Sequence, residues 1–160
     1  MTVSVRAARD DDRSFIETLG RQTALETVSP VRAITQDVAE QAFRRLVAFC
    51  RDRPGTVIFI ADVDAQPAGF LILLTDVPDD ITQLRQAFVA YVAVREGERG
   101  QGVGRALIRA AIAEGQRRDL PHISLMVSAN NAAARTLYES EDFLHDRILM
   151  SRPLRTAGAL

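Results

Sequence analysis

A glycine-rich turn between an apolar segment and a helical one has the residue types and spacing of an anion-binding site. The turn reads Arg99-Gly100-Gln101-Gly102-Val103-Gly104-Arg105 and follows the apolar residues Val92-Ala93-Val94. Glycines let the backbone adopt positive φ angles and approach a ligand closely, and the first turn of a helix leaves N–H groups unpaired. The helix dipole and two arginines add positive charge at the same place. The segment predicts a pyrophosphate site, and the alternative is a tight strand-to-helix turn without a ligand.

Three phosphate-loop patterns can be compared with this turn. A Walker A loop requires a lysine, whereas all 20 basic residues of this chain are arginine. A dinucleotide-binding G-x-G-x-x-G would need a glycine at the position of Arg105, so a dinucleotide-binding oxidoreductase is the most distant alternative. The pattern that fits is R-x-x-G-x-G over Arg99, Gly102 and Gly104.

A second motif follows about 30 residues later, as Asn131-Ala132-Ala133-Ala134-Arg135-Thr136-Leu137-Tyr138 and then Phe143. The two motifs together resemble those of the GNAT superfamily of N-acetyltransferases, [RQ]-x-x-G-x-[GA] and N-x-x-A-x-x-L-Y-x-x-x-G-F. The resemblance is strong over roughly residues 87–143, and the elements before them are compatible with the family. It departs at Asp142, where the family has glycine. Aspartate tolerates a left-handed conformation, so the departure concerns the local turn more than the activity.

The resemblance implies that acetyl-CoA is the acyl donor and that no metal takes part. Its contacts are expected at Val92, Ala93, Val94, Arg99, Gly100, Gln101, Gly102, Val103, Gly104, Arg105, Asn131 and Tyr138. The strand before the loop carries a bulge in the family, and a bulge leaves main-chain groups free for pantetheine and the acetyl carbonyl. Asn131 has a second expected role as the N-cap of its helix.

Acetyl transfer to an amine requires an unprotonated amine, a stabilised carbonyl oxygen and a proton for the departing sulfur. By resemblance Tyr138 is the expected general acid, because a phenol with a pKa near 10 is not far from a thiol with a pKa of about 8.5. The alternative is a tyrosine that only packs at the end of its helix. A tyrosine in either role is compatible with the motif.

The general base is not evident from the sequence. Many relatives carry a glutamate on the strand before the loop, but residues 88–94 read FVAYVAV. A water chain or a residue on the substrate side must then serve. Tyr91 is a candidate for positioning such a water and is more simply a core residue. His145 has a suitable pKa for a base but is expected in a surface loop, and His122 is expected to be structural.

The acceptor wall implied by the resemblance lies at about residues 23–34 and in the loop before the cofactor strand. Asp76, Asp79 and Asp80 offer a local negative field for a cationic amine, although a solvated acidic turn is the simpler interpretation. The expected reaction moves the acetyl group directly from the thioester to a primary amine of an unidentified small molecule, peptide or protein. The alternative is a non-catalytic regulatory module that binds CoA or acyl-CoA, which the missing glutamate keeps open.

The elements that must position these residues alternate between helical and strand patterns. Strands are expected at residues 3–6, 56–63, 68–75, 86–94, 122–127 and 147–152. Helices are expected from residues 10–12 onward and over 35–51, 104–118 and 131–141. This order indicates an α/β or α+β fold, and the resemblance implies a GNAT-like mixed, mostly antiparallel central sheet flanked by helices. One domain over residues 1–154 and a short tail over 155–160 are expected.

Composition excludes several classes of function. The chain has 160 residues, a formal net charge of -1 and one cysteine. Near-neutral charge argues against a nucleic-acid partner. A single cysteine, Cys50, cannot form an internal disulfide, and with only His122 and His145 beside it the chain has too few ligands for a closed zinc site. Cys50 is expected in the core. The longest apolar run, residues 87–94, is too short for a membrane helix, and arginines stand where a signal peptide is apolar, so a cytoplasmic protein is expected. A homodimer is left open.

Overall fold

A five-stranded sheet forms the middle layer of the structure, a computed structural model that describes residues 1–155. The strands are β1 (Val3–Ala7), β2 (Thr56–Val63), β3 (Gln66–Pro78), β4 (Arg85–Val94) and β5 (Ile123–Leu125), and they lie side by side in chain order. The pairs from β1 to β4 are antiparallel, and β5 runs parallel to β4. The predicted mixed, mostly antiparallel sheet is confirmed.

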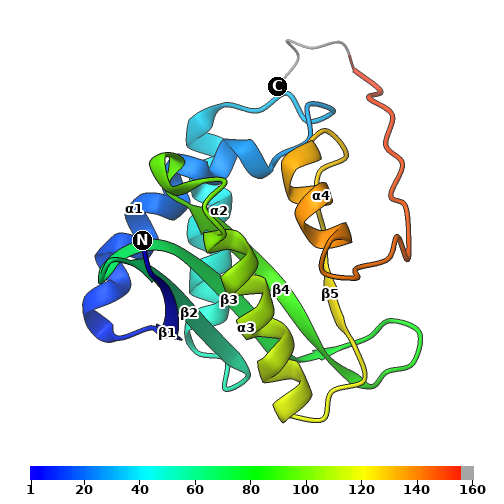
Figure 1. Cartoon of the computed structure of the whole chain (residues 1–160). Helices are drawn as coiled ribbons and strands as arrows, with labels where there is room; N and C mark the ends of the chain where they lie inside the picture. The colour runs from blue at the N-terminus through cyan, green and yellow to red at the C-terminus, as the bar shows by residue number, and fades with distance from the viewer. Residues whose placement is uncertain (156–160) are drawn as a thin grey trace.

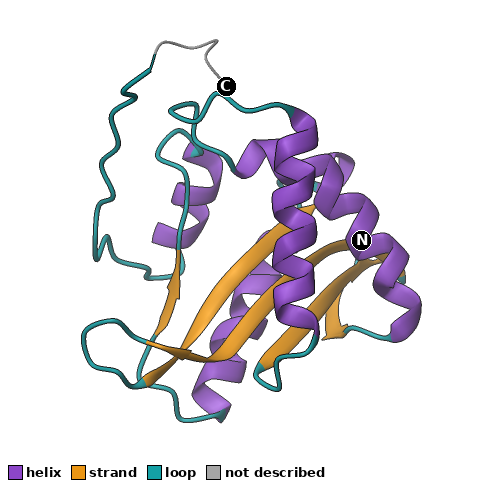
Figure 2. Ribbon diagram, turned by 180° about the vertical axis from the view of Figure 1, so that it is seen from behind, coloured by secondary structure: helices purple, strands orange, loops and turns teal. Residues whose placement is uncertain are grey.

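Helices cover both faces of this sheet. They are α1 (Arg13–Thr23), α2 (Gln36–Arg51), α3 (Val103–Arg117) and α4 (Ala132–Glu139), with short 3-10 turns η1 (Asp10–Asp12), η2 (Ala24–Thr27) and η3 (Glu96–Glu98). Figure 1 shows α3 in front of the sheet, and Figure 2 shows α2 in front of the opposite face. Thr35 caps α2 by accepting a hydrogen bond from the N–H of Val38 at 3.4 Å.

Alternating side chains of β3 divide the core into two layers. Phe70 and Ile72 point toward α1 and α2, where Phe43 and Tyr91 join them. Leu71 and Leu73 point toward α3 and α4. Both layers are needed because successive side chains of a strand face opposite sides, so a strand that is apolar throughout must be covered twice. The sheet is thus a rigid base for the loops at its ends.

The prediction of a strand over residues 147–152 is wrong. This segment forms no ladder with any described strand, and Figures 1 and 2 show residues 144–155 as a loop that runs clear of the sheet. Ile148 and Leu149 are each 79% exposed. The nearest edge, β5, has only three residues, and the side chain of Arg147 turns instead to Asp80, at 3.5 Å between Nη1 and Oδ2. Of the predicted tail, Arg155 is exposed and residues 156–160 lie outside the described residues.

An ion cluster fastens β1 to η1 and to β2. Arg6 donates to Asp12 Oδ2 at 2.7 Å and to Asp62 Oδ2 at 2.8 Å, and the two carboxylate side chains are only 7% and 11% exposed. The backbone N–H of Arg9 adds a third hydrogen bond, to Asp12 at 2.7 Å. Hydrogen bonding from Arg6 holds the pKa of Asp12 below its usual value. The arginine therefore satisfies two buried carboxylates at once.

Replacing Arg6 with methionine is expected to lower the free energy of unfolding by about 2 kcal/mol, because two buried carboxylates lose their cation. A carboxyl group with a lowered pKa stabilises the fold above about pH 4 and loses that contribution as the pH falls through the lowered value. The loss in Arg6→Met should therefore be full at neutral pH and shrink in acid. Urea unfolding between neutral pH and pH 3 measures it. Arg13→Met, at an exposed arginine without an ion pair in the described residues, should change little.

Candidate active site

β4 and β5 pair over three residues and then separate. Ala87, Phe88 and Val89 face Ile123–Leu125 in parallel register. A bulge follows at once, since β3 places Ile72 opposite Tyr91 and Leu73 opposite Val89 and so leaves Ala90 without a partner. This is the bulge that the resemblance implied before the loop. The strand beyond it is therefore bent away from β5.

The predicted main-chain contacts lie on this separated end of β4. Val92, Ala93 and Val94 keep their pairing to β3, opposite Leu71, Phe70 and Gly69. Along their other edge no strand of the described chain is paired. Unpaired main-chain groups of a strand are ready to bind an extended ligand in place of a neighbouring strand. We call this unpaired edge of β4, over residues 92–94 and next to β5, the slot; its main-chain groups have no strand partner.

The glycine-rich turn stands at the end of this slot. Gly100 and Gly102 have φ of 76° and 86°, in the left-handed region that favours glycine, and Gly102 is the N-cap of α3. A Cβ atom added at either glycine would meet nothing within 4 Å. No described group accepts a hydrogen bond from the N–H groups of residues 103–105. Open space therefore lies in front of unpaired donors and the positive end of α3.

Other residues of the turn stabilise its structure. Val103 is buried at 1% exposure, so only its backbone can face a ligand. A Cβ at Gly104 would lie 3.2 Å from Leu137 Cδ2, so glycine there lets α3 pack closely against α4. Gln101 Nε2 donates to the carbonyl oxygen of Gly97 at 2.9 Å, which closes the turn. These side chains shape the turn, and its N–H groups at residues 103–105 stay unpaired, whereas the N–H of Arg99 donates to the carbonyl oxygen of Glu96.

The two arginines of the turn are both held by carboxylates. Arg99 Nη2 donates to Glu26 Oε2 at 2.8 Å, and Arg99 Nε donates to the carbonyl oxygen of Val94 at 3.3 Å. Arg105 lies 3.3 Å from Glu141 Oε1 and donates to Ser140 at 3.2 Å. All four side chains remain near the open turn. Arg99 and Arg105 therefore carry their charge beside the unpaired amides without a rigid attachment.

Tyr138 lies on α4, on the side that faces the sheet. Its ring packs against Phe143, with centroids 5.8 Å apart, and the residue is 8% exposed. Its hydroxyl makes no hydrogen bond to any described residue and is not among the fully buried polar atoms without a partner, so it is in part accessible. Burial raises the pKa of Tyr138. The phenol is therefore protonated at neutral pH and has a proton to give.

The turn after α4 forms as expected for aspartate in place of glycine. Asp142 adopts φ of 64°, in the left-handed region. The N–H of Phe143 then donates to the carbonyl oxygen of Tyr138 at 3.1 Å. At the other end of α4, Asn131 accepts a hydrogen bond from the N–H of Ala134 at 3.1 Å, so the predicted N-cap is confirmed. The departure from the family's glycine leaves Tyr138 and Phe143 in place.

Tyr91 belongs to the core. Its hydroxyl lies 3.1 Å from the Thr23 hydroxyl and donates to the carbonyl oxygen of Gly20 at 3.1 Å. Its ring stacks on Phe70 and touches Phe43. Burial raises its pKa to about 12. This proton is not available to a base at neutral pH, and the simpler of the two expectations for Tyr91 holds.

Changing Tyr91 to phenylalanine is expected to lower the free energy of unfolding by about 1 kcal/mol, because the Gly20 carbonyl loses a buried donor. The turnover per folded molecule should stay within about twofold, because the deleted hydroxyl is hydrogen-bonded to Thr23 and Gly20 and the ring that borders the smaller cavity is kept. Chemical unfolding and a rate assay on the same preparation check both. A large loss of rate with unchanged stability would place Tyr91 in the chemistry instead.

The acidic residues of the loop after β3 are used locally. Asp79 accepts hydrogen bonds from Thr82 and Ile81, and Asp76 pairs with Arg53 at 3.1 Å. Figure 1 shows this loop at the lower right, far from the glycine-rich turn at the upper end of α3. These residues serve the local structure rather than attraction of a substrate. The expected solvated acidic turn holds only for Asp80, because Asp79 is buried and Asp76 is half-buried.

The remaining candidates are peripheral. Cys50 is buried at 2% exposure, as expected for a small core residue, and burial raises its pKa. His122 lies 3.6 Å from Asp79, and exposed His145 lies 2.8 Å from Glu139. Within residues 1–155 no three side chains of metal-binding type gather. In the same range, no helix has the length and apolar character needed to cross a bilayer.

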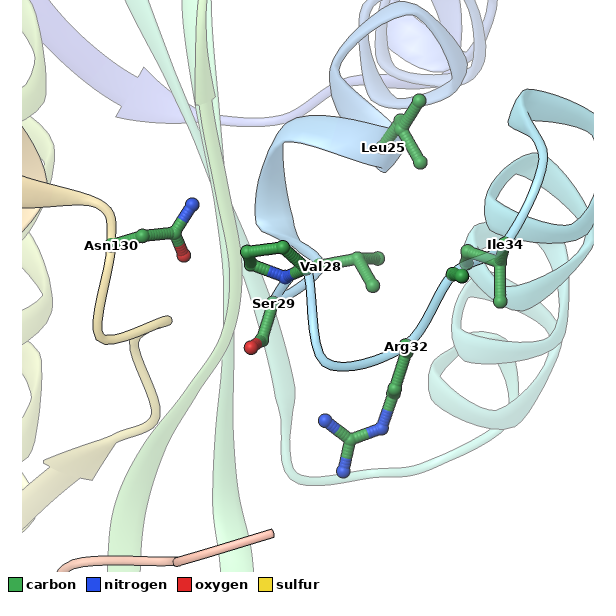
Figure 3. Close-up of a pocket in the computed structure, with 8 residues that line it drawn as sticks. Leu25, Val28, Ser29, Arg32, Ile34 and Asn130 are labelled. Carbon is green, nitrogen blue, oxygen red and sulfur yellow. The ribbon is translucent and has the colours of Figure 1, made fainter. Parts of the chain in front are cut away.

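Two open cavities lie beside η2 and the segment that connects it to α2. One, of about 330 Å³, is lined by Leu25, Val28, Ser29, Pro30, Arg32, Ala33, Ile34 and Asn130. Figure 3 shows Asn130 pointing toward the segment that carries Val28 and Ser29. The other, of about 210 Å³, is mostly apolar and reaches Tyr91 and Ala90 on β4. Both cavities lie where the acceptor wall was expected.

Glu26 was missed by the sequence reasoning. It lies on η2 between the residues that line these cavities, and it is held by Arg99 of the turn. No motif in residues 23–34 distinguishes it. Its one distinguishing mark in the sequence is that it is the sole carboxylate of that segment, and its partner lies 73 residues away.

Comparison with known proteins agrees with this geometry. Residues 24–143 match the model of the acetyltransferase (GNAT) family. The L-2,4-diaminobutyric acid acetyltransferase of Nocardia farcinica is 32% identical over 112 residues, which are 69% of this chain and 54% of that protein. The chain thus spans about half the length of this relative.

Solved structures show the same fold. A putative acetyl transferase from Pyrococcus furiosus superposes with a TM-score of 0.79 at 20% identity, covering 96% of this chain and 100% of that one. AAC(6')-Iy, in complex with the bisubstrate analog CoA-S-monomethyl-acetylneamine, superposes with a TM-score of 0.68 at 16% identity, covering 96% and 99%.

Proposed function

The chain belongs to the acetyltransferase (GNAT) family, and from this we propose that it is an acetyl-CoA-dependent N-acetyltransferase that acts on a primary amine. One observation carries the proposal. The unpaired N–H groups of residues 103–105 begin the helix that follows the free edge of β4, and the glycines between them, Gly100 and Gly102, face open space, so that one extended ligand can reach both. A diphosphate joined to a pantetheine arm has that shape and that pattern of acceptors.

The free groups of the site fit the parts of acetyl-CoA in order. The backbone of residues 99–105 takes the diphosphate, with Arg99 and Arg105 adding charge. The main chain of residues 92–94 takes the pantetheine amides in the way that a sheet edge takes a strand. Asn131 and Tyr138, at the two ends of α4, complete the contacts. The thioester then lies at the bend of β4, near the Tyr138 hydroxyl.

The chemistry follows from these positions. The amine nitrogen attacks the acetyl carbon, the N–C bond forms and the C–S bond breaks with its electron pair on sulfur. Main-chain N–H groups on the bent part of β4 stabilise the carbonyl oxygen as it gains charge. Tyr138 gives its proton to the sulfur, and burial helps because it keeps the phenol protonated until the thiolate forms.

The acceptor is assigned to the cavities along η2. Both are open toward solvent and together offer apolar walls with a few polar groups, among them Ser29 and Asn130. L-2,4-diaminobutyrate is the first amine to test, because one relative is named for acetylating it. Its small size and primary amines are compatible with a cavity of about 330 Å³.

Titration calorimetry with CoA and a thiol-release assay test the proposal. The amine panel contains L-2,4-diaminobutyrate, neamine and a lysine-containing peptide. We expect CoA binding and release of one thiol per amine acetylated. Binding without thiol release for any amine would favour the alternative of a regulatory module. Absence of binding at millimolar acetyl-CoA and CoA would contradict both.

A further inference from the structure

Glu26 joins the glycine-rich turn to the wall of the two cavities. Its contact with Arg99 spans from η2 to the residues that precede α3. On one side of it Leu25 lines the larger cavity, and on the other side Thr27 lines the smaller one. Ser128, in the loop after β5, donates to the carbonyl oxygen of Thr27 at 2.7 Å. η2 therefore crosses the mouth of the slot between β4 and β5, with Glu26 at its middle.

The carboxylate of Glu26 acts electrostatically on Tyr91, the residue of β4 that follows the bulge at Ala90. Its negative charge adds to burial in raising the pKa of Tyr91, whose hydroxyl lies beneath η2. Residues 84–95 of the chain contain no carboxylate, and residues 23–34 contain only Glu26. While it is paired with Arg99, Glu26 lines neither cavity, although Leu25 and Thr27 on either side of it do. It is therefore the one acidic side chain of these two segments that can turn toward an amine once Arg99 is withdrawn.

The ion pair between Glu26 and Arg99 is weak enough for another anion to replace Glu26. The two side chains are 54% and 44% exposed, and an ion pair in contact with water is held weakly. A diphosphate is a stronger partner for a guanidinium, because it carries more charge and accepts two parallel hydrogen bonds. Arg99 belongs to the turn that faces this diphosphate. The diphosphate of CoA therefore competes with Glu26 for the guanidinium of Arg99.

We propose that Glu26 is the residue that binds the ammonium group of a cationic acceptor amine and takes a proton from it. It does so after the diphosphate of CoA has drawn Arg99 away. The proposal rests on the proposed function and adds its missing base. It also sets an order, since the carboxylate becomes available to the amine only when the acyl donor is in place.

The protons balance. The ammonium gives one proton to Glu26, and the resulting amine attacks the acetyl carbon. The N–C bond forms, the C–S bond breaks, and the sulfur takes the proton of Tyr138. The new amide nitrogen then gives its surplus proton to the Tyr138 phenolate, and Glu26 releases its proton to water. The products are the amide, the free thiol of CoA and one proton.

The test compares Glu26→Gln with Glu17→Gln, a change at an exposed glutamate of α1 without an ion pair in the described residues. Calorimetry measures CoA affinity, and thiol release measures kcat/KM for the panel amine with the highest wild-type rate. In Glu26→Gln the arginine is free beforehand, so CoA should bind about two- to fivefold more tightly. The same variant should lose about a hundredfold or more in kcat/KM for the amine. Glu17→Gln should change neither quantity.

The two effects have opposite signs, which general damage to the fold would not produce. Equal or weaker CoA binding in Glu26→Gln would overturn the exchange with Arg99. Wild-type kcat/KM in Glu26→Gln would overturn the acceptor role. A wild-type protein that does not bind CoA, or that binds it and acetylates no amine of the panel, is the separate failure of the proposed function.

Discussion

Replacing Tyr138 with phenylalanine is expected to slow acetyl transfer by about a hundredfold while CoA affinity stays within about twofold. The ring packs against Phe143 and keeps its place without the hydroxyl. The hydroxyl makes no hydrogen bond to a described residue, so its removal leaves no protein group unpaired. What is lost is the proton for the departing sulfur. Steady-state rates at saturating acetyl-CoA, together with calorimetry of CoA, measure the two quantities.

The matched control for this variant is Tyr91→Phe. Both changes delete one phenol oxygen, but Tyr91 holds buried hydrogen bonds and Tyr138 holds none. The first should therefore cost stability and spare the rate, and the second should spare stability and cost the rate. If Tyr138→Phe retained the full rate, the assignment of this tyrosine as general acid would be wrong.

Gly102→Val is expected to weaken CoA binding by about a hundredfold or more. Gly102 has φ of 86°, which costs a β-branched residue on the order of 1–3 kcal/mol in backbone strain. The added Cβ would stand in the open space before the first turn of α3, where the diphosphate is proposed to bind. Calorimetry with CoA measures the loss, and circular dichroism verifies that the variant is folded.

Gly97→Val is the control for this change. It adds the same side chain in the same loop, where a Cβ also meets nothing within 4 Å, but its backbone is not in the left-handed region. CoA affinity should therefore stay within about threefold of the wild type. Gly104→Val is less informative, because its Cβ would strike Leu137 and disturb the packing of α4. Equal losses in the variants at positions 97 and 102 would show that the turn is sensitive to bulk in general.

Elements whose signals are local could be predicted closely. The strand expected over residues 56–63 is β2, and α2 begins after the predicted cap at Thr35 and ends at Arg51. Apolar spacing and capping residues act within a few positions, so they can be read without knowledge of the fold. The missing strand at residues 147–152 shows the limit. Alternation of side chains permits a strand, but only an adjacent strand edge makes one.

The site divides in the same way. The positive φ angles of Gly100 and Gly102 and the free first turn of α3 follow from glycine and helix signals inside one short segment. The bulge at Ala90 depends on register between β3 and β4, which residue types do not determine. Glu26 depends on the fold to bring η2 against the turn. Sequence therefore predicted the geometry of the glycine-rich turn and indicated no residue on η2.

The most direct measurement is a pair of titrations of the protein followed by ¹⁵N–¹H spectra. One titration uses CoA, and the other uses pantetheine, which lacks the diphosphate. The amides of Gly102 and Gly104 and their neighbours should shift with CoA and stay in place with pantetheine, because only CoA can accept hydrogen bonds there. Saturation by CoA with these amides unmoved would mean that the nucleotide binds elsewhere, and the account would be wrong.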